Sequence, residues 1–140
     1  MATSDRFNFQ VITPDRKAFS AEVASVILPG VVGQFGVLPG HAPFFSILKI
    51  GLMRIIYEHL GKTELMALSG GFAQVRGNEV VVLTPSAERA EEIDVNRAEA
   101  ALKRAEERIA SHSSEIDMAR AQAALTRALN RLAVARQQTP

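Results

Sequence analysis

The stretch TPSAERAEEIDVNRAEA, residues 84–100, marks a change in the kind of backbone that the chain builds. All nine glycines, all seven phenylalanines and five of the six prolines lie upstream of it or in its first two residues. Downstream, Ala, Arg and Glu dominate, and the sixth proline stands at position 140. Glycine and proline punctuate strands and turns, whereas Ala, Arg and Glu favour helices. We therefore predict a change of fold class here, with parts 1–86 and 87–140.

The second part has the periodicity of two helices. Asp94 is a suitable N-cap and Val95 opens the first helix. Apolar residues then recur at helical spacing as far as Ile109, and again over 118–135. The polar run SHSS at 111–114 separates the two stretches. A break this short predicts an antiparallel hairpin of helices of about 16 to 20 residues each.

The hairpin is expected to be held together weakly, because its predicted interface is mostly alanine. The large apolar side chains on it are Leu102, Ile109, Leu125, Leu129 and Leu132. Each contributes about 1.5–3 kcal/mol if fully buried, whereas ordering roughly forty residues costs about 1 kcal/mol or more for each residue. Intrinsic propensity forms each helix but does not hold one against the other. We predict a marginally docked, movable hairpin.

The first part has the pattern of many short strands. Phe7, Phe9 and Val11 alternate with polar residues before a turn at 13–16. Further β-branched or aromatic segments, each bounded by turn signals, follow at 23–28, 44–50, 52–59, 65–69, 71–75 and 79–84. No helical period falls between them, so parallel β-α-β units are not expected. The pattern favours an antiparallel sandwich or flattened barrel.

Composition and charge narrow the class of protein. The formal net charge of +1, without basic clusters interleaved with aromatics, gives no indication of nucleic-acid binding. The chain has no cysteine, hence no disulfide or thiolate metal site. Residues 1–6 lack the apolar core of a signal peptide, and the longest apolar stretch, 44–57, is interrupted too often for direct membrane insertion. We expect a soluble protein that reaches a membrane only as a peripheral partner.

No arrangement of residues indicates catalysis. The tripeptide GKT at 61–63 looks like the end of a phosphate-binding loop, but the glycine that this motif needs is replaced by Ile56. The GG pair at 70–71 fits a turn or a bulge. Three histidines are scattered along the chain: His41, His59 and His112. Their spacing fits neither a metal site nor a hydrolytic triad, so we predict a protein that is not an enzyme and binds no metal.

Cationic side chains gather at the open end of the predicted hairpin. If the turn centres on 112–113, facing residues have numbers that sum to roughly 225. This places Asp94 near Arg131 and Ala98 near Arg127, with Arg97 beside both. The N-terminus of the first helix also attracts anions.

Two interpretations of this cluster stay open. With Glu88 and Asp94 as acceptors at its edge, it suits a nucleotide, whose phosphates would meet the arginines and whose sugar and base would meet the carboxylates. In the structural alternative, Asp94 caps its helix and pairs with Arg131 while the other arginines are solvated.

Six motifs spread over nearly the whole chain resemble the ε subunit of the F-type ATP synthase. They are VITPDR at 11–16, FGVLPGHAP at 35–43, LSGGF at 68–72, AERA at 87–90, IDVNRA at 93–98 and LNRL at 129–132. The combination of LPGHAP and SGGF at this spacing is highly specific. The resemblance implies a non-catalytic subunit of the central stalk in a proton-translocating enzyme, peripheral on the cytoplasmic face of a bacterial membrane.

The resemblance also implies partners. The family's β-sandwich binds the γ subunit and rests on the proteolipid (c) ring. Its hairpin either folds down or extends, and the extended form inhibits ATP hydrolysis. Basic side chains such as Arg120 would then meet acidic surface on the catalytic α and β subunits. Where the family often has Glu in the ring-facing loop, this chain has Gln34, so His41 becomes the better candidate for a ring contact, unless it packs the turn.

The resemblance finally implies a regulatory ligand, because the segment Ile/Leu-Asp-x-x-Arg-Ala marks family members that bind ATP. This segment is complete at 93–98, and the family's companion residues match the cluster above. The expected ATP-binding residues are Glu88, Ile93, Asp94, Arg97, Ala98, Arg127 and Arg131. ATP at ~1000 times its dissociation constant stabilises the state that binds it by about 4 kcal/mol, enough to hold a marginal hairpin folded. The alternatives are the same subunit without a working ATP site, and a free-standing adaptor.

Overall fold

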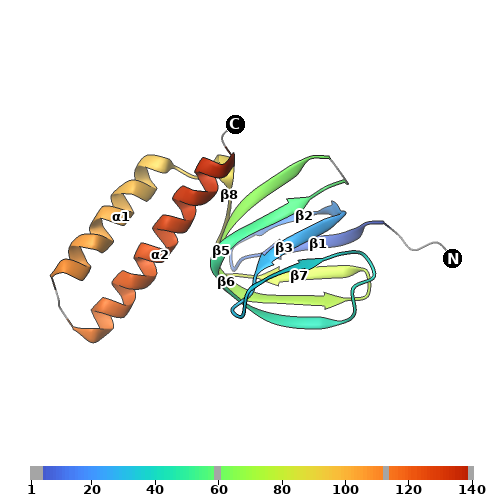
Figure 1. Cartoon of the computed structure of the whole chain (residues 1–140), viewed down its shortest axis with the longest axis horizontal. Helices are drawn as coiled ribbons and strands as arrows, with labels where there is room; N and C mark the ends of the chain where they lie inside the picture. The colour runs from blue at the N-terminus through green and yellow to red at the C-terminus, as the bar shows by residue number, and fades with distance from the viewer. Residues whose placement is uncertain (1–4, 59–60, 112–113, 139–140) are drawn as a thin grey trace. The chain divides into compact units, whose positions relative to one another are not determined.

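The computed structural model describes residues 5–58, 61–111 and 114–138 (Figure 1). His59 and His112 lie outside the described residues, as does most of the 1–6 segment considered above as a possible signal peptide. The chain divides into two compact units, Met1–Arg89 and Ala90–Pro140. The first is built of strands and the second of helices, so the predicted change of fold class is confirmed.

Eight strands form the described part of the first unit. They are β1 (Phe7–Ile12), β2 (Lys17–Val23), β3 (Ser25–Pro29), β4 (Gln34–Val37), β5 (Phe44–Ile56), β6 (Thr63–Arg76), β7 (Glu79–Leu83) and β8 (Ala87–Arg89). The order in the sheet is β2-β1-β7-β6-β5-β3-β4, and β8 pairs with β6. The sheet folds over on itself, so that its two halves face each other as in a sandwich (Figure 1). Most neighbours are antiparallel, but β1 and β7 run parallel, which makes the sheet mixed.

The core of this unit follows from the alternation of apolar and polar residues. In β1 the side chains of Phe7, Phe9 and Val11 are buried while Asn8 is exposed. The rings of Phe9 and Phe19 pack with centroids 5.8 Å apart. Large apolar side chains from both halves of the sheet are buried alongside them, and these include Leu28, Met53, Ile55, Met66, Val80 and Val82. The sandwich therefore has a core of large side chains.

The strands β5 and β6 are longer than expected, because each replaces two predicted short strands. β5 runs through Gly51, and β6 runs through Gly70 and Gly71. Gly71 has a φ of 107°, and a Cβ there would lie 2.0 Å from the carbonyl oxygen of Leu83, so the position requires glycine. The ladder between the two strands skips Lys49 and Gly70, one residue on each strand, and the pairing on both sides of this gap keeps the same register. A bulge would shift the register, so the glycine pair forms neither a turn nor a bulge and lies within a continuous strand.

The second unit contains η1 (Ala90–Glu92), α1 (Val95–Ala110) and α2 (Glu115–Gln138). The N-cap was predicted correctly, since Oδ1 of Asp94 accepts a hydrogen bond from the amide of Arg97 at 3.1 Å. α1 has 16 residues, as expected, but α2 has 24 and is longer than expected. The two helices lie antiparallel (Figure 1), so the helical hairpin is confirmed.

Small side chains occupy the buried positions of the hairpin. The buried residues of α1 are Ala98 and Ala105. Those described in α2 are Ala121, Ala128, Leu132 and Val134. Of the large residues that we expected at the interface, Leu132 is buried, Leu102, Ile109 and Leu125 are half-buried, and Leu129 is 49% exposed. The expectation for Leu129 was wrong, whereas the predominance of alanine is confirmed.

Candidate functional site

The start of α1 is organised by Asp94. Its carboxylate is exposed and accepts the hydrogen bond from the amide of Arg97 described above. This bond satisfies one of the amides that a helix start leaves unpaired, and the negative charge offsets the positive end of the helix dipole. The structural interpretation of Asp94 as a cap is therefore confirmed, and a role in holding a nucleotide would be additional to it.

Two residues of the IDVNRA segment are buried. Ile93 is 8% exposed and Ala98 is 3% exposed. The amide of Ile93 also closes the short turn of η1, because it donates a hydrogen bond to the carbonyl of Ala90 at 3.3 Å. In this conformation the two residues shape the start of the hairpin, and a contact with a ligand stays a prediction for both.

An ion pair joins the two helices of the hairpin. Oε1 of Glu99 and Nη2 of Arg136 lie 3.9 Å apart, and both side chains are exposed. Side chains this long reach across several residues, so the contact does not fix which residues of the two helices face each other. The predicted facing of Asp94 with Arg131 and of Ala98 with Arg127 stays a prediction.

The predicted basic residues of α2 differ in exposure. Arg127 and Arg131 are half-buried and lie one turn apart on the helix. Arg97 and Arg120 are exposed. Glu88 is half-buried and belongs to strand β8 of the first unit, whereas the other predicted ATP-binding residues belong to the second. Among the described residues, no group of three or more His, Asp or Glu side chains is placed to hold a metal ion.

The predicted ring-facing loop joins β3 to β5 through β4. Gln34 is exposed at the start of β4, opposite Pro29. His41 is half-buried, its Nδ1 lies 2.7 Å from the carbonyl oxygen of Ala42, and its ring packs edge-on against Phe44 with centroids 5.7 Å apart. These contacts show that His41 packs the turn, and a contact with a ring stays a prediction.

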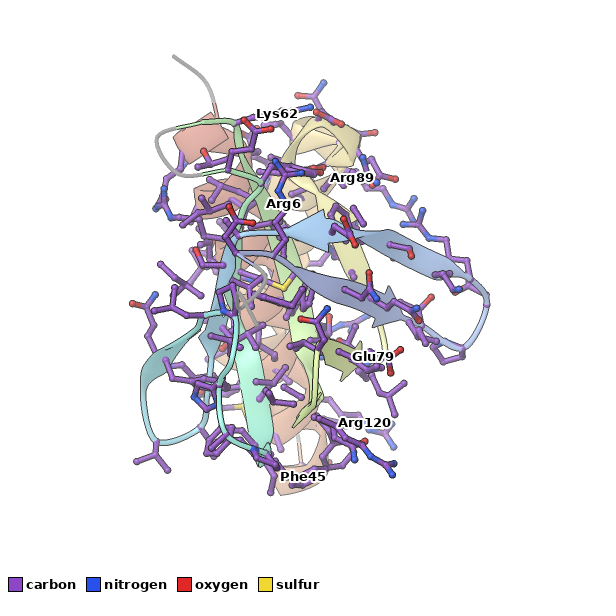
Figure 2. All side chains as sticks on the ribbon, turned by 90° about the vertical axis from the view of Figure 1, so that its right-hand side faces the viewer. Arg6, Phe45, Lys62, Glu79, Arg89 and Arg120 are labelled. Atoms are coloured by element: carbon purple, nitrogen blue, oxygen red, sulfur yellow. The ribbon has the colours of Figure 1, made fainter. Side chains whose placement is uncertain are left out.

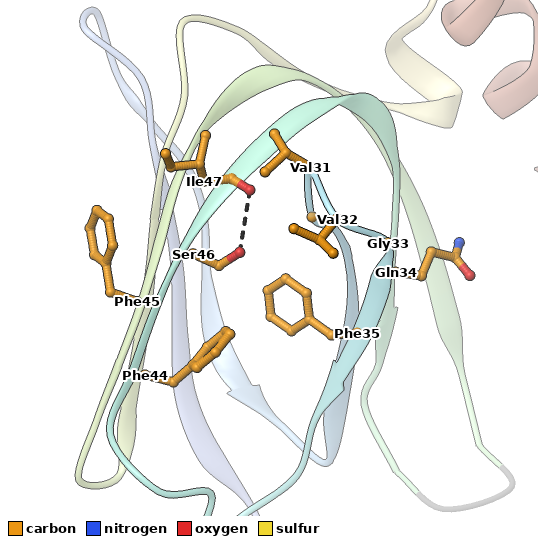
Figure 3. A pocket seen from close by; sticks show the side chains of 10 residues that line it. Val31, Val32, Gly33, Gln34, Phe35, Phe44, Phe45, Ser46 and Ile47 are labelled. Atoms are coloured by element: carbon orange, nitrogen blue, oxygen red, sulfur yellow. Dashed lines mark hydrogen bonds between the residues drawn. The ribbon is translucent and has the colours of Figure 1, made fainter.

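Next to this loop is an apolar groove of about 530 Å³. Its walls include Val31, Val32, Phe35, Phe44 and Ile47, and Figure 3 shows Phe35 and Phe44 side by side within it, with Gln34 directed outward. Val32 is fully exposed. Exposing an apolar side chain to water is unfavourable, and an exposed apolar groove often marks a protein interface. The groove is therefore a candidate for contact with another protein.

Further apolar side chains cover the outside of strands β5, β6 and β7. Phe45 and Phe72 are 61% and 46% exposed and stack with centroids 5.6 Å apart. Ile47 pairs with Phe72 across the sheet, and Phe72 with Leu83. We call these four residues the apolar outer face. Phe72 and Leu83 border a second groove of about 460 Å³ that Pro14 and Pro85 also line, whereas Phe45 and Ile47 border the first groove.

The sequence held a signal for the apolar outer face that our reasoning missed. Positions 44–48 read FFSIL, with apolar residues on both faces of one strand. A strand with one face in solvent alternates apolar and polar residues, so the lack of alternation indicates that both faces are covered.

None of the helices in the described residues is both long enough and apolar enough to cross a membrane.

A β-sandwich unit followed by a helical unit is also what comparison with known protein families finds. Residues 6–90 match the β-sandwich domain of the ATP synthase delta/epsilon chain, and residues 91–136 match the long α-helix domain of the same chain. The molecule is thus of the class of two-domain ATP synthase subunits. It belongs to the ATP synthase delta/epsilon chain family, and the resemblance predicted from the motifs is confirmed.

Individual proteins of this family support the assignment. The chain is 52% identical to the ATP synthase epsilon chain of Carboxydothermus hydrogenoformans, covering 76% of this chain and 78% of that one. It is 55% identical to the epsilon chain of Pelotomaculum thermopropionicum, covering 72% and 74%. Among solved structures, a chain of the Euglena gracilis mitochondrial ATP synthase, in an assembly of OSCP, F1 and c-ring, matches with a TM-score of 0.78 at 26% identity, covering 90% and 79%. A chain from the central stalk and c-ring of the Tetrahymena thermophila enzyme shares the fold, with a TM-score of 0.57 at 10% identity, covering 99% and 100%.

Proposed function

We propose that this chain is the non-catalytic ε subunit of the central stalk of an F-type, proton-translocating ATP synthase. In this proposal the sandwich couples parts of the rotor, and the hairpin inhibits ATP hydrolysis unless bound ATP holds it folded. The observation that carries the proposal is the combination of a well-packed sandwich with a hairpin whose buried α1 positions are alanines only. The well-packed first unit is suited to rigid attachment to other subunits, and the second is suited to a change of conformation when a ligand binds.

The apolar outer face supports an interaction with the γ subunit. Four large side chains that are 46–61% exposed lie together on three neighbouring strands, and contiguous apolar surface of this kind usually marks a protein interface. The groove beside Gln34 and His41 is the surface that we assign to the c ring. The subunit would be held at the membrane through these partners, on the cytoplasmic face.

Co-purification with γ tests this assignment. Phe45→Gln and Phe72→Gln should each reduce recovery of the complex at least tenfold, because a buried aromatic anchor contributes about 2 kcal/mol or more to an interface. Lys62→Gln, at an exposed position toward the end of the sandwich opposite Phe45 (Figure 2), is the control and should bind normally. A wild-type chain that stays alone in the presence of γ would favour a free-standing adaptor.

The half-buried arginines of α2 support the ATP assignment. Arg127 and Arg131 belong to α2, whereas Arg97 and the N-cap residue Asp94 are at the start of α1. Guanidinium groups bind phosphate oxygens in bidentate fashion. An anion between the helices would offset the repulsion among the arginines and add contacts that the alanines lack. When ATP falls, the helices would separate and Arg120, Arg127 and Arg131 would meet acidic surface on the catalytic α and β subunits.

The predicted ligand-binding residues set a requirement on the ligand. They combine arginines, which suit phosphate groups, with the carboxylates of Glu88 and Asp94, which accept hydrogen bonds and suit a sugar and a base. A nucleotide triphosphate carries its phosphates and its sugar and base at opposite ends. We therefore expect ATP to bind and inorganic phosphate to fail at the same concentration.

Isothermal titration of the full chain with ATP tests the proposal. Arg127→Ala and Arg131→Ala should each weaken binding by about tenfold or more, which is the loss of one charge-assisted hydrogen bond. Arg76→Ala, an exposed arginine of the sandwich, is the control and should titrate like the wild type. Absence of heat at millimolar ATP, or unchanged titrations in both α2 variants, would leave an ε subunit without an ATP site.

A further inference from the structure

Strand β8 is the last element of the sandwich, and it is anchored far more heavily than its length suggests. It has three residues, and so short a strand makes few backbone hydrogen bonds to its neighbour. Side chains of other elements make further hydrogen bonds to β8 and to the residue before it. Nη2 of Arg16 donates to the carbonyl of Ala87 at 3.1 Å, and the hydroxyls of Ser69 and Ser86 lie 2.6 Å apart just before the strand.

The strongest of these anchors involves Glu64 of β6. Its carboxylate is buried, accepts a hydrogen bond from the hydroxyl of Tyr57 on Oε2 at 2.5 Å, and has Oε1 3.3 Å from Nε of Arg89. Oε1 makes no hydrogen bond in the described structure, so the nearby guanidinium charge is what offsets its burial. Arg89 in turn lies over the ring of Phe19, with Cζ 5.5 Å from the centroid.

The location of this network is specific. Arg89 pairs with Met66 across the β6–β8 ladder, so Glu64, two residues away on the same face of β6, is its diagonal neighbour. Figure 2 shows Arg89 at the end of the sandwich where Arg6 and Lys62 also lie, with Phe45 at the opposite end. Arg89 is also the last residue of the first unit, and Ala90 begins the second.

A buried carboxylate at this position is not explained by stability. Replacing a buried ion pair by apolar residues of similar size is often neutral or stabilising, whereas removing one partner is strongly destabilising. The network therefore contributes geometry: it holds one short strand in one place. A leucine at position 64 would fill the same space without fixing Arg89.

We propose that Glu64 is a positioning residue that locks β8 to the sandwich through Arg89, so that movement of the hairpin begins at Ala90. From Ala90 the chain continues as the three-residue 3-10 turn η1, where the amide of Ile93 donates to the carbonyl of Ala90 at 3.3 Å. Because of the contact between Glu64 and Arg89, β8 stays paired with β6 when the hairpin opens. The inference relies on the proposed function only in that the hairpin moves.

Residue-resolved amide hydrogen exchange on the full chain without nucleotide tests this inference. In the wild type, the amides of β8 should exchange at least tenfold more slowly than those of η1. Glu64→Gln keeps the shape of the side chain and removes its charge, and it should speed exchange in β8 at least tenfold. The amides of Met53 and Ile55 in β5 should stay within twofold of wild type, which separates local release from global unfolding.

The matched control is Glu58→Gln, which removes the partner of Arg6 in an exposed ion pair and should leave β8 unchanged. If Glu64→Gln does not fold, Tyr57→Phe removes the other bond to Glu64 and should release β8 with smaller amplitude. The inference is overturned if β8 exchanges as in wild type in the folded variants, or if wild-type β8 already exchanges as fast as η1. Since no nucleotide is present, either result leaves the titration with ATP to decide the proposed function separately.

Discussion

The two units of this molecule are filled with side chains of different size. The sandwich buries Phe9, Leu28, Met53 and Met66 completely, whereas the buried positions of α1 are Ala98 and Ala105. Large side chains contribute a few kcal/mol each on burial, and alanine contributes much less. The stability of the sandwich thus comes from its own core, whereas we expect the association of the two helices to have a small margin, on which the proposed regulation by a ligand depends.

The largest effect expected from this contrast is in the sandwich. Phe9 has no exposed surface, so Phe9→Ala should destabilise the first unit by about 3–5 kcal/mol, through lost transfer free energy and the cavity that remains. Urea unfolding followed by the fluorescence of Tyr57 should show the loss, while the helical signal in far-UV circular dichroism persists. A loss of both signals in one transition would mean that the units do not unfold separately.

A smaller effect is expected from enlarging the hairpin interface. Ala105 is 2% exposed, and Ala105→Leu should force the helices apart at a cost of about 1–3 kcal/mol. Leucine is also a good helix former, so the helices should persist while amide exchange at their interface accelerates. Ala100→Leu places the same side chain on the exposed side of α1 and should change nothing. If the two variants behaved alike, the buried alanines would not determine how the helices associate.

A third effect concerns the start of α1. Asp94→Ala removes the cap and should cost about 1 kcal/mol, seen as faster exchange of the Arg97 amide and lower helicity. Asp94→Asn keeps the capping oxygen and should preserve the helix. Comparison of the two variants in the ATP titration separates the cap from any contact of the carboxylate with the ligand. Equal helicity in Asp94→Ala and wild type would remove the capping role.

The smallest effect lies in the first turn of the sandwich. The hydroxyl of Thr13 donates to Oδ1 of Asp15 at 2.7 Å, and this bond lowers the pKa of Asp15 below its ordinary value of 3.8. When folding lowers the pKa of a carboxyl group, the group stabilises the folded state at pH values above its pKa in the unfolded chain. This stabilisation is lost as the pH falls through the pKa of the folded state. An NMR titration should find the midpoint below 3.8. Thr13→Val should raise it, and an unchanged midpoint would show that the hydrogen bond has no effect.

Much of the fold could be predicted from the sequence because its signals are local. The cap at Asp94, the start of α1 at Val95 and the alternation of Phe7, Phe9 and Val11 are properties of neighbouring residues, and each was predicted correctly. The strand β8 was missed because AER, its sequence, consists of good helix formers. It becomes a strand only through β6 and the contacts of Arg16 and Glu64, which are distant in sequence.

The sequence names the residues of the predicted ATP site but does not determine how they lie relative to one another. The residues of the IDVNRA segment are evident, but which residues of α2 face them depends on the path of a turn that no local pattern fixes. The burial of Ile93 and Ala98 depends equally on what packs over them. The anchoring of Arg89 by Glu64 was missed because an isolated glutamate in a strand gives no sign of its distant partner.

In the proposed function the hairpin closes around nucleotide, and the distance between its two helices measures this closure directly. The chain has no cysteine, so Ala100→Cys and Ala133→Cys, both at exposed positions, allow a spin label on each helix of the full chain. Pulsed electron paramagnetic resonance should show a broad distance distribution without ligand and a narrow, short one at millimolar ATP, with inorganic phosphate leaving it broad. A distribution that is equally narrow and short with and without ATP would contradict the account.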